Sequence, residues 1–277
     1  MIAHLAQILA LLALAPLLQG ILKSLRARLQ GRPGPSPLQP YRDLRKLAHK
    51  GIVVPRDVSL VFLAAPGFYA GSALVLTYLV PPLGSRAPLD AIAIALVLAF
   101  GRFALVLAAL DARSSFEGMA ASREAAFAAL GEAPLVLALV STVLPGATSL
   151  GALFTAAAIF IVNLSETARV PVDNQETHYE LTMIHEGLAL EYSGRHLALV
   201  QYASYVRQAA LLMLAAMVLP GSGALTLAWF CALLLATAVI ERTFAKLRLF
   251  EVPSLFALAT LLAVFGIAAR LTGVALW

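Results

Sequence analysis

A series of long apolar runs restricts the possible folds of this chain more than any other feature. A membrane-spanning helix needs roughly 20 mainly apolar residues, and 61% of the 277 residues are hydrophobic, compared with about 45–50% in typical soluble domains. The runs are continuous rather than alternating, which excludes a transmembrane β-barrel. The sequence therefore predicts an all-α fold, a polytopic membrane helix bundle of about eight transmembrane helices, built as a single integral membrane domain over residues 1–277. The predicted spans are Ile2–Leu22, Val58–Val80, Leu89–Leu110, Ala133–Leu144, Leu150–Leu164, Leu197–Leu219, Ala224–Ile240 and Pro253–Leu271.

Two of these spans are short and adjacent. Ala133–Leu144 and Leu150–Leu164 are separated by Pro145 and Gly146, which typically interrupt a helix. A tight helical hairpin is therefore expected here rather than one very long helix.

The basic residues predict the orientation of the bundle. Of the 20 Lys and Arg residues, 16 lie in the odd-numbered connections, whereas the even-numbered connections carry only Arg86. The positive-inside rule then places the odd-numbered connections in the cytoplasm and both termini outside. The net charge of +5 is thus explained by topology, and no soluble basic face suited to nucleic acid is present. The predicted cytoplasmic loops cover about residues 23–57, 111–132, 165–196 and 241–252.

The first cytoplasmic connection has two parts. Four prolines between residues 33 and 40 favour an extended segment. Tyr41, Leu44 and Leu47 then recur at helical spacing, with charged residues on the opposite face, which predicts a short helix lying in the membrane interface. This helix could be an anchor on anionic lipid or a docking surface for a soluble partner, and the sequence leaves both interpretations open.

A strongly polar segment, residues 163–196, interrupts the apolar spans. It holds 6 of the 15 carboxylates and 3 of the 5 histidines. From Asn174 onward Glu176 and Glu180 recur at helical spacing, so a pair of carboxylates on one helix face could hold and pass a proton. A solvated cytoplasmic loop is the alternative. His178 and His185 lack a third ligand, which favours hydrogen bonding or partner contact over a metal site.

Two arginines lie within the predicted spans. Arg207 is near the middle of Leu197–Leu219, and Arg102 lies about two thirds of the way along Leu89–Leu110. An arginine at this depth is costly unless it is paired or hydrated. Arg102 could extend toward the cytoplasmic face, whereas Arg207 lies beside a polar stripe that indicates a wet or protein-lined interior. The stripe consists of Gln201, Ser204, Tyr205 and Gln208.

Four loops together resemble one known family. Residues 166–186 read ETARVPVDNQETHYELTMIHE and residues 191–194 read EYSG. The first loop contains GPSPLQPYRD at 34–43, the third contains SFEGMAASRE at 115–124, and the seventh contains Glu241 followed by AKLRLF at 245–250. These motifs resemble the respiratory complex I subunit 1 family. Within that family they are most similar to the formate hydrogenlyase subunit 4 branch, the membrane subunit of group 4 nickel–iron hydrogenase complexes.

The resemblance implies a function. The chain is expected to be the membrane subunit of a complex I-like energy-converting hydrogenase or formate hydrogenlyase complex, docking the soluble redox subunits and coupling electron transfer to proton or sodium translocation. The expected partners are hydrogenase-like large and small subunits, an iron–sulfur subunit and antiporter-like membrane subunits. The nickel–iron centre and iron–sulfur clusters are expected in those partners, with no cofactor, metal or catalytic centre in this chain. The expected location is the cytoplasmic (inner) membrane of a bacterium or archaeon.

Position in the chain and the resemblance together suggest roles for individual residues. Asp173 is expected to be held ionised by Arg169 and Arg207, as a fixed charge beside the proton-transferring carboxylates. The residues predicted for proton transfer and coupling are Glu166, Glu176, Glu180, Glu241, Asp173, Arg169 and Arg207. Those predicted for partner docking are Arg42, Asp43, Arg45, Lys46, His178, His185 and Glu186.

Two alternative functions remain at this point. A quinone-binding subunit of an NADH:quinone oxidoreductase-like complex would need a headgroup-sized cavity beneath Tyr41–Leu47. Against it, the chain has Val172 where that branch typically has phenylalanine, and its first loop lacks that branch's usual glycines. A stand-alone secondary ion transporter is the other alternative, although the sequence shows no internal repeat of the kind such folds use.

Overall fold

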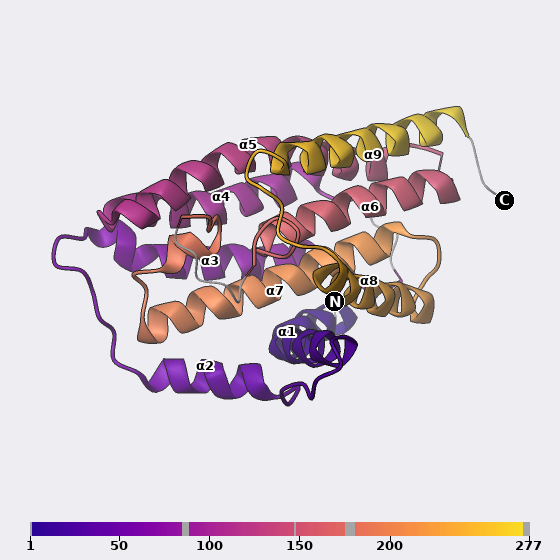
Figure 1. The fold of residues 1–277 in the computed structure, drawn as a ribbon. Coiled ribbons are helices and arrows are strands. Elements are labelled where there is room, and N and C mark those ends of the chain that lie inside the picture. The colour runs from indigo at the N-terminus through magenta and orange to yellow at the C-terminus, as the bar shows by residue number, and fades with distance from the viewer. Residues whose placement is uncertain (1, 85–88, 147, 175–180, 274–277) are drawn as a thin grey trace.

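The computed structural model describes residues 2–84, 89–146, 148–174 and 181–273, and within these ranges every regular element is a helix (Figure 1). Eight of the helices are long and apolar enough to cross a membrane, which confirms the predicted fold class. Their bounds are α1 Ile2–Leu29, α3 Leu60–Leu79, α4 Ala91–Asp111, α5 Ser115–Val143, α6 Ser149–Glu166, α7 Gly194–Val218, α8 Ala224–Thr243 and α9 Val252–Thr272. Two short elements complete the fold, α2 Gln39–His49 and the 3-10 helix η1 Glu186–Ala189.

Helix α5 is much longer than the sequence predicted. The expected span begins at Ala133, whereas the helix begins at Ser115 and continues through Pro134 for 29 residues. Most of the third cytoplasmic loop, predicted at 111–132, is therefore helical. The segment is rich in alanine, with Met, Glu and Arg, all strong helix formers, so the helix extends beyond the apolar run that marks the membrane.

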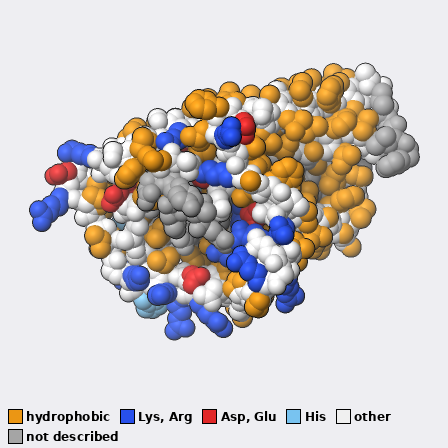
Figure 2. Space-filling model, viewed as in Figure 1, with side chains coloured by type: hydrophobic (Ala, Val, Ile, Leu, Met, Phe, Trp, Pro, Cys, Tyr) orange, Lys and Arg blue, Asp and Glu red, His pale blue; other side chains and the backbone are white. Residues whose placement is uncertain are grey.

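Helix α7 lies at the centre of the bundle. It packs against α1, α3, α6 and α8, and 78% of its apolar window is buried inside the chain, the largest share of any span. Its contact faces contain many alanines, including Ala209, Ala210, Ala215 and Ala216, all fully or almost fully buried. Small residues allow close helix approach within a membrane. Larger apolar side chains instead cover the outer surface, most plainly over the α5 and α9 end of the molecule (Figure 2).

The first connection folds back onto the bundle. The proline segment lies against α1, where a Cβ added at Gly20 would lie 1.8 Å from the Pro37 carbonyl oxygen, and Ser24 donates a hydrogen bond to Pro35 O at 2.5 Å. The predicted short helix is present as α2, beside α7 and α1 (Figure 1). An extended connection then leads from α2 to α3.

The described part of the polar segment between α6 and α7 does not form the continuous α-helix that the sequence predicted. Residues 181–185 form turns and a bend, followed by the single 3-10 turn η1. The backbone N–H of Ile184 donates to the Asp173 carboxylate at 3.0 Å instead of to a helical carbonyl, because that carboxylate competes for it. Glu176 and Glu180, the predicted carboxylate pair, lie outside the described residues, as does His178.

Candidate functional site

The first part of the site is built around Glu166, the last residue of α6. Arg207 of α7 donates from Nη2 to Glu166 Oε2 at 2.8 Å, and Arg102 of α4 donates from Nη2 to Glu166 Oε1. All three side chains are buried, with Arg207 only 1% exposed. The two arginines that the sequence placed within spans therefore share one carboxylate, and Arg102 is paired inside the bundle instead of extending to the surface.

Arg207 is held by further contacts on its other side. It donates to the carbonyl of Leu98 at 3.2 Å and contacts the Ser72 hydroxyl at 3.5 Å. Its guanidinium lies 4.7 Å from the centre of the Tyr69 ring, a cation–π contact. A Cβ at Gly101 would lie 2.6 Å from Arg207 Nη1, so only glycine at this position leaves room for the arginine.

A buried histidine and a second carboxylate close this cluster into a ring. His185 Nδ1 lies 3.4 Å from Glu124 Oε1 and its Nε2 lies 3.3 Å from the Tyr69 hydroxyl. Glu124 Oε1 is in turn 3.8 Å from Arg102 Nε. Burial alone would lower the pKa of His185, but the neighbouring Tyr69 and Glu124 outweigh it and raise the pKa to about 10. This shift favours the protonated form of His185 in the folded chain.

A second network surrounds Glu241 at the end of α8. Arg169 donates to Glu241 at 2.7 Å, and Arg26 of α1 approaches the same carboxylate at 3.5 Å. Arg169 also donates to Gln208 at 2.8 Å and to Gln19. Gln208 follows Arg207 directly on α7, so the two networks meet at adjacent residues of the central helix.

Asp173 has a different partner from the expected one. Arg169 pairs with Glu241 and Arg207 pairs with Glu166, so the prediction that these arginines hold Asp173 is wrong. Lys246, in the connection after α8, instead lies 2.7 Å from Asp173. The sequence could not show this, because the pairing depends on how the connection folds back over the polar segment.

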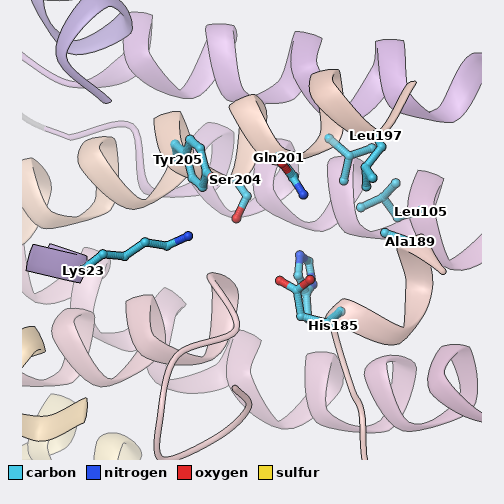
Figure 3. A pocket seen from close by; sticks show the side chains of 10 residues that line it. Lys23, Leu105, His185, Ala189, Leu197, Gln201, Ser204 and Tyr205 are labelled. Carbon is cyan, nitrogen blue, oxygen red and sulfur yellow. The ribbon is translucent and has the colours of Figure 1, made fainter. Parts of the chain in front are cut away.

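A pocket with polar and apolar lining opens beside His185 (Figure 3). It holds about 90 Å³, enough for about three to six water molecules. Lys23, Ser204 and Tyr205 contribute polar groups from α1 and α7 around it (Figure 3). The quinone alternative predicted a cavity beneath Tyr41–Leu47, whereas the lining found among the described residues comes from α1, α4, α7 and the η1 region.

The predicted docking residues divide between surface and interior. Arg42, Arg45 and Lys46 are exposed on α2 and Asp43 is partly exposed, and Figure 2 shows basic side chains gathered along this lower edge of the molecule. His185, in contrast, is 7% exposed, because it belongs to the internal ring. Glu186 lines the pocket beside it.

Some site residues were missed by the sequence argument. Glu117 and Glu124 lie on the unexpectedly long α5 and are both buried; Glu117 accepts the backbone N–H of Glu191 at 2.8 Å. Gln19 also belongs to the internal network. The only signal for the two glutamates in the sequence is the third-loop motif at 115–124, which carries both of them. Within the described ranges no three His, Cys, Asp or Glu side chains form a candidate metal site.

Comparisons with known proteins agree with the fold. Residues 2–270 match the family described as NADH dehydrogenase. Hydrogenase-4 component C of Escherichia coli (strain K12) is 32% identical over 272 residues, covering 91% of this chain and 84% of that protein. Formate hydrogenlyase subunit 4 of the same organism is 31% identical over 280 residues, covering 88% and 90%.

A solved structure has the same fold. It is a chain in the structure of the membrane-bound sulfane sulfur reductase (MBS), an archaeal respiratory membrane complex. The TM-score is 0.81, with 97% of this chain and 98% of that chain covered and 19% identity. The likeness extends over the whole bundle.

Proposed function

This chain belongs to the NADH dehydrogenase family, and we propose that it is a membrane subunit of a complex I-like hydrogenase or formate hydrogenlyase complex. In that complex it would couple electron transfer in soluble partners to proton or sodium translocation. The observation that carries the proposal is the pair of buried networks, one around Glu166 and one around Glu241, which meet on α7. Ionisable groups at membrane depth are costly and mark ion or proton pathways. The Escherichia coli relatives are named as components of hydrogenase-4 and formate hydrogenlyase.

The ring around Glu166 is suited to passing on a change of charge. It joins two carboxylates, Glu124 and Glu166, to Arg102, Arg207 and His185. Because these groups are buried and in contact, a proton gained or lost by one alters the charge balance felt by the others. The pocket beside His185 has room for water, through which a proton would reach the ring from that side.

We assign proton transfer to four carboxylates, Glu166, Glu176, Glu180 and Glu241, with Asp173, Arg169 and Arg207 as charged neighbours. The test is ion uptake into vesicles that contain the whole complex, measured beside redox turnover with a soluble dye. Single changes of Glu176, Glu180 or Glu241 to Gln should preserve turnover and lower uptake sharply, because Gln keeps the size but not the titratable proton. Glu166→Gln should lower uptake and also stability, because two buried arginines contact this carboxylate. Wild-type uptake in all four variants would leave the segment with a purely structural role.

The exposed face of α2 is the proposed docking surface for soluble subunits. Arg42, Arg45 and Lys46 present three positive charges there, and charge complementarity fixes partner choice and register. Their combined change to Glu should release soluble subunits from the purified complex, whereas Arg113→Glu, an exposed arginine in another connection, should not. An intact complex in the triple variant would assign these residues to lipid anchoring.

The redox centres of the complex would belong to its partners. An iron–sulfur cluster typically takes four cysteine thiolates, whereas this chain has one cysteine, Cys231, exposed on α8. The proposed partners are hydrogenase-like large and small subunits, an iron–sulfur subunit and antiporter-like membrane subunits. The nickel–iron centre and the clusters would be held there.

The proposed orientation places both termini outside the cytoplasm. It depends on the bias of basic residues toward the odd-numbered connections, which include the loops that carry the polar networks. A membrane-impermeant thiol reagent applied from outside should label cysteines introduced at Gly84 and Gly221 and should miss one at Ser36. Labelling of Ser36 from outside would reverse the topology.

A further inference from the structure

A buried arginine without a partner lies at the end of the bundle opposite the polar networks. Arg270 is on the last turn of α9 and is 8% exposed. Its Nε is buried without a hydrogen-bond partner, and its side chain makes no ion pair with any residue that the structure describes. A buried charge is unfavourable unless it is paired. The unpaired guanidinium therefore points to an anion from outside the chain.

The beginning of α6 supplies the second half of a site. This helix has 18 residues, and the first N–H groups of a helix lack intrahelical acceptors. Thr148 caps one of them by accepting from Gly151 N at 3.1 Å, while the Ser149 hydroxyl is buried and has no partner among the described residues. Free N–H groups and the positive end of the helix dipole favour an anion.

Close packing joins these two halves. A Cβ on Gly151 would lie 2.9 Å from Arg270 Cγ, so the arginine side chain fits against the first turn of α6 because residue 151 has no side chain. The turn between α5 and α6 also lies close to Arg270, since a Cβ on Gly146 would lie 2.3 Å from the Arg270 carbonyl oxygen. Helices α6 and α9 lie against each other up to this end (Figure 1).

We propose that Arg270, Ser149 and the first turn of α6 bind the phosphate group of a phospholipid. A guanidinium forms paired hydrogen bonds with phosphate oxygens, and helix N-termini bind phosphate through their N–H groups. The site lies at the ends of two membrane spans, the depth at which headgroups are found. Exposed apolar side chains flank it, with Val143 54% and Leu271 65% exposed, and they provide a surface for acyl chains.

The test is lipid binding by the whole complex after delipidation, followed by native mass spectrometry with dioleoyl phosphatidylglycerol as the probe. Arg270→Gln should remove one bound lipid or weaken its binding at least about tenfold, as expected for a lost charged hydrogen-bond partner. Arg270→Lys keeps the charge but not the paired geometry and should give a smaller loss, as should Ser149→Ala. Arg28→Gln, exposed at the other end of the bundle, is the matched control and should bind like wild type.

Two further probes separate a lipid from free phosphate. Dioleoylglycerol has the same chains without the phosphate and should not bind at this site. Inorganic phosphate should displace the lipid poorly, because it lacks the acyl contacts. Saturation of the site by inorganic phosphate with no preference for lipid would overturn the lipid assignment. Equal lipid binding in wild type, Arg270→Lys and Ser149→Ala would overturn the site, even if Arg270→Gln failed to assemble.

Discussion

Changing Glu166 to Gln should strongly destabilise the chain, because it leaves two buried guanidinium groups facing a neutral amide. Arg207 lies 2.8 Å from one oxygen of this carboxylate, and Arg102 contacts the other. Arginine can only donate hydrogen bonds, so the amide nitrogen of the glutamine would have no acceptor on one side. Each arginine side chain is at most 5% exposed, so solvent cannot replace the lost charge.

The size of the effect follows from these contacts. A hydrogen bond to a charged group contributes about 1.5–3 kcal/mol, and Glu166 makes one with each arginine. Removing one partner of a buried ion pair costs about 3–5 kcal/mol. The two estimates agree on a loss of about 3–5 kcal/mol, a large fraction of the roughly 5–15 kcal/mol typical of a folded protein.

The measurement is the free energy of unfolding in mixed micelles of neutral detergent and dodecyl sulfate, followed by circular dichroism. Glu191→Gln is the control, since this glutamate is exposed, and it should change stability by no more than about 0.5 kcal/mol. The double variant Arg102→Gln with Glu166→Gln should lose less than the sum of the single losses, with a coupling energy of about 0.5–3 kcal/mol. A loss below about 1 kcal/mol for Glu166→Gln would refute the charge argument.

Two further predictions concern the same ring. Gly101→Ala should lower stability by about 1–3 kcal/mol through overpacking, since its Cβ would lie 2.6 Å from Arg207 Nη1. Gly67→Ala, which has open space around it, should be tolerated in the same mixed-micelle unfolding assay. The pKa of His185 is raised to about 10 in the folded chain, compared with about 6.5 for an ordinary histidine. The protonated form therefore stabilises the fold fully below about pH 6.5, and this stabilisation is lost as the pH rises to about 10. Wild-type unfolding free energy should therefore fall between pH 7 and pH 9, by up to about 1.4 kcal/mol per pH unit, and Glu124→Gln should flatten this dependence. An unchanged slope in that variant would contradict the role given to the Glu124 carboxylate.

Local properties of the sequence predicted the helices well. An apolar run of sufficient length specifies a span without reference to the rest of the chain, and eight such helices are present. The same holds for α2, whose apolar and charged faces follow from helical spacing alone. The start of α5 was predicted wrongly, because hydropathy marks where a helix is apolar and not where it begins.

The charged site could be predicted only in outline. The sequence showed that Arg102 and Arg207 lie within spans and that the polar segment holds many carboxylates. It also selected Glu166 and Glu241 as candidates for proton transfer. It did not reveal the burial of Glu124, because that residue was placed in the cytoplasmic loop at 111–132.

Tertiary structure alone decided which charges pair. Glu166 is 41 positions from Arg207 and 64 from Arg102, and no local pattern connects residues so far apart. Their meeting depends on the rotation of α4, α6 and α7 about their axes, which side-chain packing determines. The sequence by itself determined the spans, the basic loops and the set of available charges. Packing determined that Lys246, from the connection after α8, is the partner of Asp173, because that connection folds back over the polar segment.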